Sequence, residues 1–216
     1  MKEIIQELKN FLKPKDIGTD SDRALLLDFQ ATLEIKPEKA IKLEKDALAQ
    51  IETITVDNAR LVSNLHANLG GLYRMNGHPD LAREHMEKSI SLLDQFNLLH
   101  INDSIPQIAN YAMFLTEQQE PERGISELQK LSGIIKEYHS DHCLDYAKVQ
   151  ETLGTIYLMT ANLPQAKTHF KRAFKIYEKI WADEPEMIEA KYQEIQELYP
   201  QIGFSIGKTL SGLLTK

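Results

Sequence analysis

The stretch GHPDLA, residues 77–82, places a glycine and then a proline at the start of a predicted helix. Proline suits the first turn of a helix, because the N–H that it lacks would have no partner within the helix there. Similar stretches recur as IKPEKA from residue 35, QEPERG from 119 and NLPQAK from 162. Their prolines stand at positions 37, 79, 121 and 164, so the first two intervals are both 42 residues. This spacing indicates an internal repeat.

Other features share this period. A shift of 42 residues aligns four small residues that follow the prolines, namely Ala40, Ala82, Gly124 and Ala166. Upstream, NLGGLY (68–73) and TLGTIY (152–157) lie 84 residues apart, with NYAMFL (110–115) midway between them. Prolines, small residues and these hexapeptides therefore define one repeating unit.

Each unit reads as two helices. Apolar residues spaced by three or four, as one face of a helix requires, mark the first helix: Leu61, Leu65, Leu69 and Leu72. We expect Asp57 to cap this helix and Asn76-Gly77 to end it in a left-handed conformation. The second helix starts at Pro79, and its predicted apolar face is Leu81, His85 or Met86, Ile90, Leu93 and Phe96. The small residue at 82 or 166 is expected where the two helices cross closely.

The segment IETITV, residues 51–56, conflicts with this register because it alternates apolar and polar residues like a short strand. A shift of 42 matches Ile51 with Leu93 and Ile54 with Phe96, at the end of a second helix. On this basis we predict that 51–56 is helical.

The composition is that of an ordinary soluble chain, with 42% hydrophobic and 26% charged residues among 216. Cys143 stands alone, and the start MKEIIQELKNFLKPK carries charges where a signal peptide has an apolar run, so we expect a cytoplasmic protein. No segment has the roughly 18 apolar residues of a membrane helix. A formal charge of −7 disfavours nucleic acid, which calls for a basic face. Neither a membrane nor nucleic acid is expected as a partner.

Three features carry residue types that catalytic, nucleotide or metal sites use. GFSIGKT at 203–209 resembles a phosphate-binding loop, but the glycine spacing is one residue short and no strand precedes it. HSDHC at 139–143 lacks the separated ligand pairs of a zinc site and is better explained as a loop that starts a helix at an Asp cap. His85 and His169 share one repeat position, which indicates packing. We therefore predict no catalytic residue, no metal and no cofactor, and the chain is not expected to be an enzyme.

The motif L-G-x-x-Y at 69–73 and 153–157, followed by A-x-x-x-[MF] at 82–86 and 166–170, resembles the tetratricopeptide repeat (TPR). The position of the family's tryptophan holds His66, Ile108 and Gln150 here. The period is also longer than the usual 34, and the eight extra residues suggest about one more turn per helix. Such long units resemble the repeats of kinesin light chain and of related bacterial regulators.

The resemblance implies an all-α fold, a right-handed α-solenoid of antiparallel helix pairs with about ten to eleven helices. We expect one domain over 1–216, divided into an N-terminal capping helix (1–19), a degenerate repeat (20–56), three repeats (57–98, 99–140, 141–183) and C-terminal capping helices (184–216). Helix 2–13 and the apolar residues between Ile206 and Leu214 would cap the stack. A dimer contact or membrane docking through these ends is the alternative.

A solenoid offers a concave surface formed by the first helices of its repeats. In this chain the corresponding stripe is polar with little charge. We expect it to bind an extended peptide through Asn64, Asn68, Gly71, Met75, Asn110, Met113, Lys148, Thr152 and Thr155. In repeats of the kinesin light chain type, an asparagine at the position of Asn68 and Asn110 holds the peptide backbone. The alternative for both is a structural hydrogen bond between neighbouring helices.

The resulting function hypothesis is a non-catalytic module that binds a peptide or protein segment in its concave groove. Two alternatives remain open. One is a self-associating structural or adaptor protein, a homodimer through its terminal helices. The other is a regulatory subunit that senses a small signalling peptide, as some bacterial proteins with similar repeats do.

Overall fold

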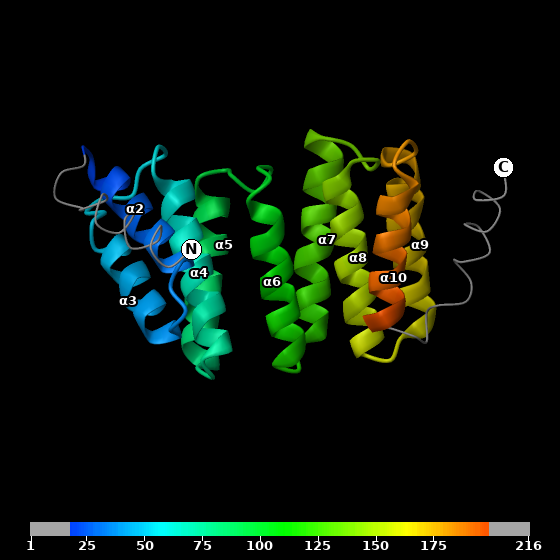
Figure 1. Cartoon of the computed structure of the whole chain (residues 1–216), viewed down its shortest axis with the longest axis horizontal. Coiled ribbons are helices and arrows are strands. Elements are labelled where there is room, and N and C mark those ends of the chain that lie inside the picture. Colours follow the sequence, from blue (N-terminus) through cyan, green and yellow to red (C-terminus); the bar gives the residue numbers. More distant parts are fainter. Residues whose placement is uncertain (1–17, 199–216) are drawn as a thin grey trace. The chain divides into compact units, whose positions relative to one another are not determined.

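The computed structural model describes residues 18–198, which form nine α-helices and connecting loops without a strand (Figure 1). The helix predicted over 2–13, the phosphate-loop-like segment 203–209 and the apolar C-terminal residues lie outside the described residues. In chain order, the helices are α2 (Asp20–Thr32), α3 (Pro37–Leu48), α4 (Ala59–Met75), α5 (Pro79–Gln95), α6 (Ser104–Glu117), α7 (Pro121–Tyr138), α8 (Leu144–Met159), α9 (Leu163–Ile180) and α10 (Pro185–Leu198). Within this described part, no helix is long and apolar enough to cross a membrane.

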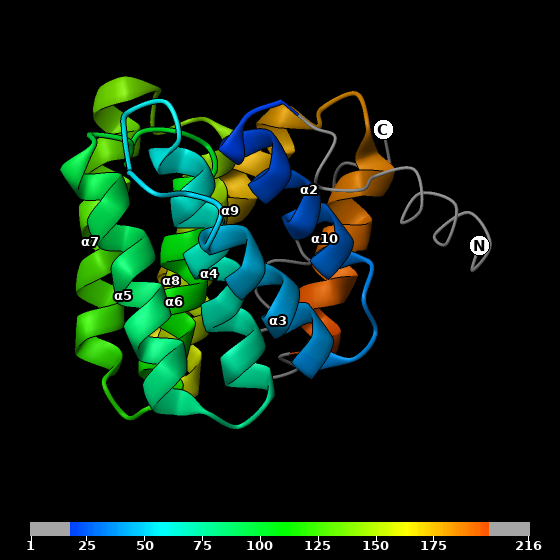
Figure 2. The ribbon, with the colours of Figure 1, turned by 90° about the vertical axis from the view of Figure 1, so that its left-hand side faces the viewer.

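The chain divides into two compact units, and the boundary falls within α6, between Tyr111 and Ala112. In the first unit, α2 packs against α3, α3 against α4, and α4 against α5 (Figures 1 and 2). In the second unit, α7 packs against α8, α8 against α9, and α9 against α10. Consecutive helices joined by short loops run antiparallel, so each unit is a stack of helix pairs.

The second helix of each pair begins 42 residues after the previous one, at Pro37, Pro79, Pro121 and Leu163. The turn before the last three of these helices has a left-handed residue, with φ of 76° at Gly77, 65° at Gln119 and 59° at Ala161. Only the first is a glycine. Each of the three turns is closed by an equivalent backbone hydrogen bond. In the first turn, for example, the N–H of His78 donates to the carbonyl of Tyr73 at 2.9 Å. These bonds satisfy carbonyls at the end of the helix, and they favour the turn even without glycine.

The two helices of a pair approach closely where small residues meet. A Cβ on Gly70 would lie 2.6 Å from Cγ of Met86 and 3.3 Å from the carbonyl oxygen of Ala82. In the next pair the small residues change sides, and a Cβ on Gly124 would lie 2.6 Å from the carbonyl oxygen of Ala112. The predicted close crossing at Ala82 is confirmed.

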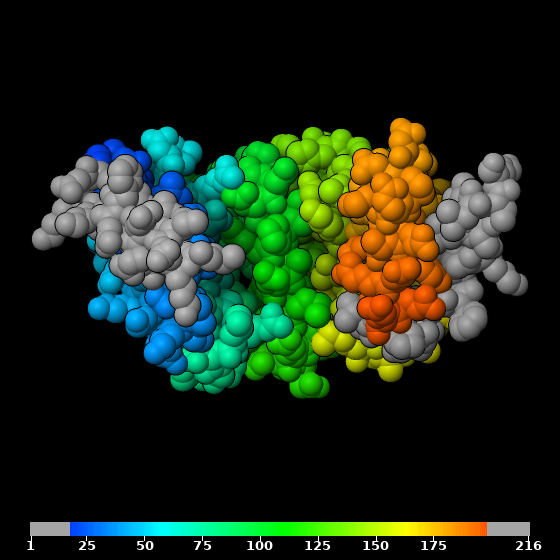
Figure 3. All heavy atoms as spheres, in the orientation of Figure 1, coloured from blue at the N-terminus to red at the C-terminus, as the bar shows by residue number. Residues whose placement is uncertain are grey.

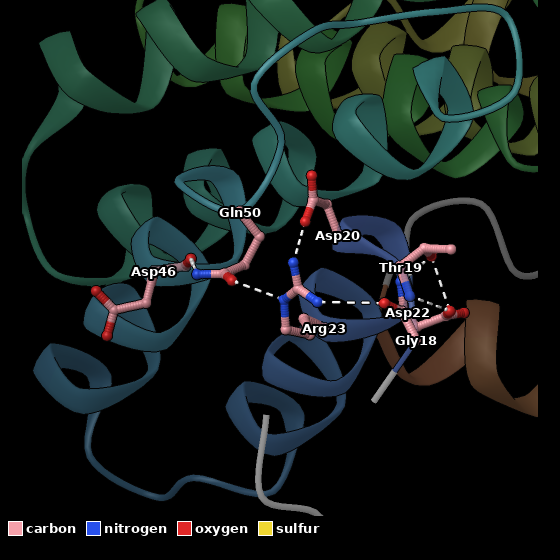
Figure 4. Close-up of polar contacts among 7 residues, drawn as sticks. All are labelled: Gly18, Thr19, Asp20, Asp22, Arg23, Asp46 and Gln50. Atoms are coloured by element: carbon pink, nitrogen blue, oxygen red, sulfur yellow. Dashed lines mark hydrogen bonds and ion pairs between the residues drawn. The ribbon is translucent and has the colours of Figure 1, made fainter. Parts of the chain in front are cut away.

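The N-terminus of α2 is fixed by a capping box (Figure 4). The N–H of Asp22 donates to Oγ1 of Thr19 at 3.2 Å, and the N–H of Thr19 donates to the Asp22 carboxylate at 2.9 Å. The next residue, Arg23, pairs with Asp20 and donates from Nε to Oε1 of Gln50 at 3.3 Å. Since Gln50 follows α3, this arginine ties the start of α2 to the end of its partner helix.

The prediction that 51–56 is helical is wrong. Helix α3 ends at Leu48, and 51–56 form a loop that leads to α4. Asn58 holds this loop, because its side chain accepts from the N–H of Thr55 at 2.8 Å and donates to the carbonyl of Thr53 at 2.9 Å. Asn58, and not the predicted Asp57, is the residue before the first turn of α4. The β-branched threonines also disfavour a helix here.

The predicted apolar face of α4 is confirmed at Leu65 and Leu69, which are fully buried, while Leu61 and Leu72 are half-buried. On α5 the buried face is rotated from the prediction: Leu81 is 40% exposed, and Ser89 is buried beside Leu93. The pattern of apolar residues could not reveal this rotation, because Ser89 is buried through hydrogen bonds rather than through apolar contacts.

Within the second unit, α10 packs against α9 and is exposed over much of its outer side (orange in Figure 3). Ile188 and Ile195 are buried, while Nζ of Lys191 lies 2.8 Å from the carboxylate of Glu151 on α8. A helix is thus present at the start of the 184–216 segment, over Pro185–Leu198, as expected.

Candidate peptide-binding site

Three of the predicted groove residues, Gly71, Met75 and Asn110, line one cleft in the first unit. The cleft lies among α4, α5 and the first part of α6, and its volume is about 210 Å³. The other residues around it, which the sequence did not single out, are Ala67, Arg74, Met86, Ser89 and Gln107. The helices of neighbouring pairs thus bring together residues about 40 positions apart.

Each of the three predicted residues can contact a ligand in this cleft. The Met75 side chain is 81% exposed, and a thioether is flexible and polarizable enough to adapt to different apolar partners. Asn110 is exposed, and its amide makes no hydrogen bond to the rest of the described chain. An amide can both donate and accept, as a peptide unit does. A Cβ on Gly71 would meet nothing within 4 Å, so the backbone of α4 is open at this point.

Buried polar side chains join the helices beneath the cleft. The hydroxyl oxygens of Ser63 on α4 and Ser89 on α5 lie 2.8 Å and 2.5 Å from Oε1 of Gln107 on α6. Both serines are fully buried, so their hydrogen bonds are needed to offset the loss of hydration. This cluster holds the three helices that form the cleft.

Asn64 extends the cluster and is already bonded. Its Oδ1 accepts from Nε2 of Gln107 at 2.5 Å, and its Nδ2 donates to the carboxylate of Asp103 at 3.3 Å. Asp103 in turn accepts from Nε of Arg60 at 2.6 Å, and this contact lowers the pKa of the Asp103 carboxyl. Asn64 therefore connects neighbouring helices instead of presenting a free amide.

Asn68 makes interhelical hydrogen bonds, which was the structural alternative for this residue. Its Nδ2 donates to Oδ1 of Asp28 on α2 at 2.8 Å and to Oε1 of Glu44 on α3 at 3.2 Å. Glu44 is 1% exposed, and its Oε2 has no hydrogen-bond partner among the described residues. Burial, reinforced by the charge of Asp28, raises the pKa of Glu44 to about 9, so this carboxyl is protonated at neutral pH.

The sequence analysis did not identify Asp28 and Glu44, the two carboxyl groups that bind Asn68, although the sequence indicates a buried acidic residue on α3. Glu44 stands between Ala40 and Ala47 at helical spacing, which places a charged residue on the buried face of α3. A charged residue on an apolar face is a reason to search for a hydrogen-bond partner on the adjacent helix.

The remaining predicted residues belong to the second unit. Met113 is half-buried, and Lys148 is exposed with its Nζ 3.9 Å from the Asp145 carboxylate. The hydroxyls of Thr152 and Thr155 donate to carbonyls of their own helix, at 3.0 Å and 3.1 Å. These two donors are already used within α8, so the cleft in the first unit is the better candidate site.

The recurring histidines have a packing role, as predicted. His85 stacks on Tyr73 with ring centroids 5.4 Å apart, and His169 stacks on Tyr157 at 5.2 Å. Nδ1 of His169 also lies 2.9 Å from Oε1 of Gln150. Burial lowers the pKa of His169 to about 4, so its ring is neutral at physiological pH.

The HSDHC segment is the loop between α7 and α8, but its predicted cap is wrong. Cys143 precedes α8, and its Sγ accepts from the N–H of Tyr146 at 3.5 Å. Asp141 instead pairs with the ring of His142.

The comparisons with known proteins agree with this architecture. Residues 104–179 match the tetratricopeptide repeat family. The match spans α6 to α9 and therefore covers two of the helix pairs described above. In the frame of this match, α6 and α8 correspond to the first helices of successive repeats, and α7 and α9 correspond to the second helices. No curated protein matches the chain.

Several solved structures have the same fold at low sequence identity. BtubC (BKLC) from P. vanneervenii aligns with a TM-score of 0.70 and 17% identity, over 98% of this chain and 88% of that chain. A putative kinesin light chain from Podosopora anserina with nearly identical TPR-like repeats aligns with a TM-score of 0.69 and 14% identity, over 84% and 88%. MamA gives a TM-score of 0.55 and 16% identity, over 81% and 87%. At these identities the likeness shows the fold, an all-α TPR solenoid type built from antiparallel helix pairs.

Proposed function

We propose that the chain is a cytoplasmic, non-catalytic module that binds an extended peptide or protein segment in the cleft of α4, α5 and α6. The observation that carries this proposal is the pairing of an exposed thioether, Met75, with an exposed amide that has no described partner, Asn110, around one cleft. TPR folds serve widely as scaffolds for protein partners, which agrees with this assignment.

The size of the cleft favours a peptide over a small molecule. Small-molecule pockets usually have volumes of about 300–1,000 Å³. A cleft of about 210 Å³ is below this range and accommodates one apolar side chain of a partner. Asn110 at its edge can then hydrogen-bond the backbone of the same segment, independently of its sequence.

The affinity must be shared between both kinds of contact. A hydrogen bond of Asn110 to the peptide contributes about 1 kcal/mol net, because the amide gives up water to form it. Burial of apolar surface against Met75 adds about 25 cal/mol per Å². We therefore expect micromolar rather than nanomolar binding for one such cleft.

The test uses a substitution that fills the cleft without disturbing the fold. A Cβ at Gly71 would meet no atom within 4 Å, and Gly71 lines the cleft, so Gly71→Leu adds a bulky side chain at the cleft. Gly133, in the interior of α7, has equally open space, and Gly133→Leu is the matched control. Both changes improve helix propensity by up to about 1 kcal/mol, so neither variant should unfold.

Peptides selected on the native chain from a displayed random library are titrated against both variants. We expect Gly71→Leu to weaken binding by at least about tenfold, equivalent to 1.4 kcal/mol, and Gly133→Leu to leave it unchanged. Equal binding to Gly71→Leu and to the native chain would refute the cleft as the site. Light scattering on the native chain separately tests the alternative of self-association.

A further inference from the structure

The second unit contains a cavity that the proposed function does not use. Its volume is about 350 Å³, and it lies among the end of α7, the loop before α8, the first turn of α8 and the C-terminal half of α9. The residues around it are Lys136, Asp141, His142, Tyr146, Arg172, Lys175, Ile176 and Lys179.

The cavity is basic although the whole chain has a formal charge of −7. Four of its residues are lysine or arginine, and its one carboxylate, Asp141, is already paired with the His142 ring. Nζ of Lys136 lies 5.2 Å from the centre of the Tyr146 ring, a cation–π contact that leaves its charge without a counter-ion in the described part of the chain. Three of the cavity cations, Arg172, Lys175 and Lys179, lie on α9, and within residues 18–198 they form no ion pair with a carboxylate.

These three cations lie on one face of α9. Arg172, Lys175 and Lys179 are spaced by three and four residues, so each is a neighbour of the next on the helix surface. Like charges at this spacing repel one another and destabilise a helix. The dipole of α9 offsets this cost for Lys179, in the last turn, but not for Arg172. An anion in the cavity would turn this repulsion into attraction.

We propose that this cavity binds a phosphate monoester group. A dianion matches several unpaired cations better than the single charge of a carboxylate. The planar guanidinium of Arg172 can contact two phosphate oxygens at once, and the lysines act as point charges. The positive end of the α8 dipole lies at the same cavity, at Tyr146, and adds to the attraction for an anion.

The size and the lining favour a group attached to something larger. A volume of about 350 Å³ falls within the range of small-molecule pockets and exceeds the needs of a bare phosphate ion. Ile176, 6% exposed, gives the cavity an apolar patch for the carbon atoms of a phosphorylated side chain or a small phosphate ester. The site lies in a different unit from the α4–α5–α6 cleft and does not depend on the proposed function.

The experiment titrates the full chain with N-acetyl-phosphoserine amide by calorimetry at low salt. The variant Arg172→Gln/Lys175→Gln removes two cavity cations. The matched control, Lys167→Gln/Lys171→Gln, removes the same charge from exposed positions of the same helix outside the cavity. All four residues are exposed, so both proteins should fold, and circular dichroism checks this; Lys179→Gln provides a milder single change.

We expect saturable 1:1 binding that the cavity variant weakens by about tenfold or more and that the control variant changes by less than about twofold. Inorganic phosphate and N-acetyl-glutamate amide are the other probes. Phosphate that binds as tightly as the phosphoserine probe identifies a site for free phosphate or a small ester. Tighter binding of the phosphoserine probe identifies a phosphorylated chain as the source.

Three results would overturn the proposal. The first is the absence of saturable binding. The second is an equal loss in both double variants, which would indicate general attraction by the basic helix. The third is equally tight binding of the glutamate probe or of a single-stranded oligonucleotide, since neither carries a dianionic monoester.

Discussion

Replacing Glu44 by glutamine should make the protein more stable at alkaline pH and leave it equally stable near pH 5. The folded chain raises the pKa of this carboxyl from its ordinary 4.5 to about 9, chiefly through burial. Between these values the folded state retains a proton that the unfolded state releases. The free energy of unfolding of the native chain must therefore fall as the pH rises from about 5 toward 9.

The magnitude follows from the linkage between protonation and folding. One retained proton corresponds to a slope of about 1.4 kcal/mol per pH unit. Even half of this slope accumulates to about 2 kcal/mol between pH 5 and pH 8. Glutamine is neutral at every pH, and its amide can accept from Asn68, as Oε1 of Glu44 does, and donate toward Asp28. The substitution therefore removes the titration while it keeps the hydrogen bonds.

The assay is urea unfolding followed by circular dichroism at several pH values between 5 and 8. Other groups titrate as well; burial lowers the pKa of His66 to about 4, for example, but this contribution is common to both proteins and cancels in the difference. Glu52→Gln, at an exposed position in the loop after α3, is the control and should follow the native curve. Parallel curves for the native chain and Glu44→Gln would refute the assignment of a buried, protonated carboxyl.

Three further predictions concern packing, the two asparagines and acid stability. Gly154→Ala should lower the free energy of unfolding by about 1–3 kcal/mol, because its Cβ would lie 2.9 Å from the ring of Phe170 on α9. Gly133→Ala, at an open position, should raise it by up to about 1 kcal/mol. Urea unfolding measures both, and equal effects would contradict the close crossing of α8 and α9. Asn68→Ala should lower the free energy of unfolding by about 1–3 kcal/mol, because it leaves the carboxyl groups of Asp28 and Glu44 without their donor. Asn110→Ala should change it by less than about 0.5 kcal/mol. A larger loss for Asn110→Ala than for Asn68→Ala would exclude the structural role of Asn68. The folded chain lowers the pKa of His169 to about 4. His169 therefore contributes stability that is present above its ordinary pKa of 6.5 and lost as the pH falls through 4. In thermal unfolding, the melting temperature of His169→Gln should fall less at acidic pH than that of the native chain.

The helix pairs could be predicted from the sequence because each rests on a repeated local signal. Prolines in the first turns, small residues at the crossings and a left-handed residue in the turn between the two helices recur with one period, and each acts within a few residues of its position. The prediction of a helix at 51–56 was wrong because the 42-residue shift assumes that every repeat has helices of equal length. Helix α3 has 12 residues and α5 has 17, and the loop after α3 is held by the side-chain hydrogen bonds of Asn58, whose place His100 takes in the next repeat.

The candidate site was predictable only in part, since burial and pairing depend on neighbours from other helices. Gly71, Met75 and Asn110 do line one cleft. Asn64, in contrast, is bonded to Gln107, a residue 43 positions away whose type has no equivalent in the other repeats. A stripe drawn along one helix identifies which residues face a neighbour, but not whether that neighbour offers a polar partner.

Asn68 and Asn110 show how the repeat itself can resolve this ambiguity. They occupy the same position of successive repeats, yet Asn68 bonds to Asp28 and Glu44, while Asn110 has no described partner. A shift of 42 residues replaces those two partners by Gly70 and Met86, which cannot accept such a hydrogen bond. The same amide is therefore structural in one repeat and available to a ligand in the next. In a repeat protein of this kind, the residue types at the partner positions, rather than the asparagines alone, distinguish the two roles.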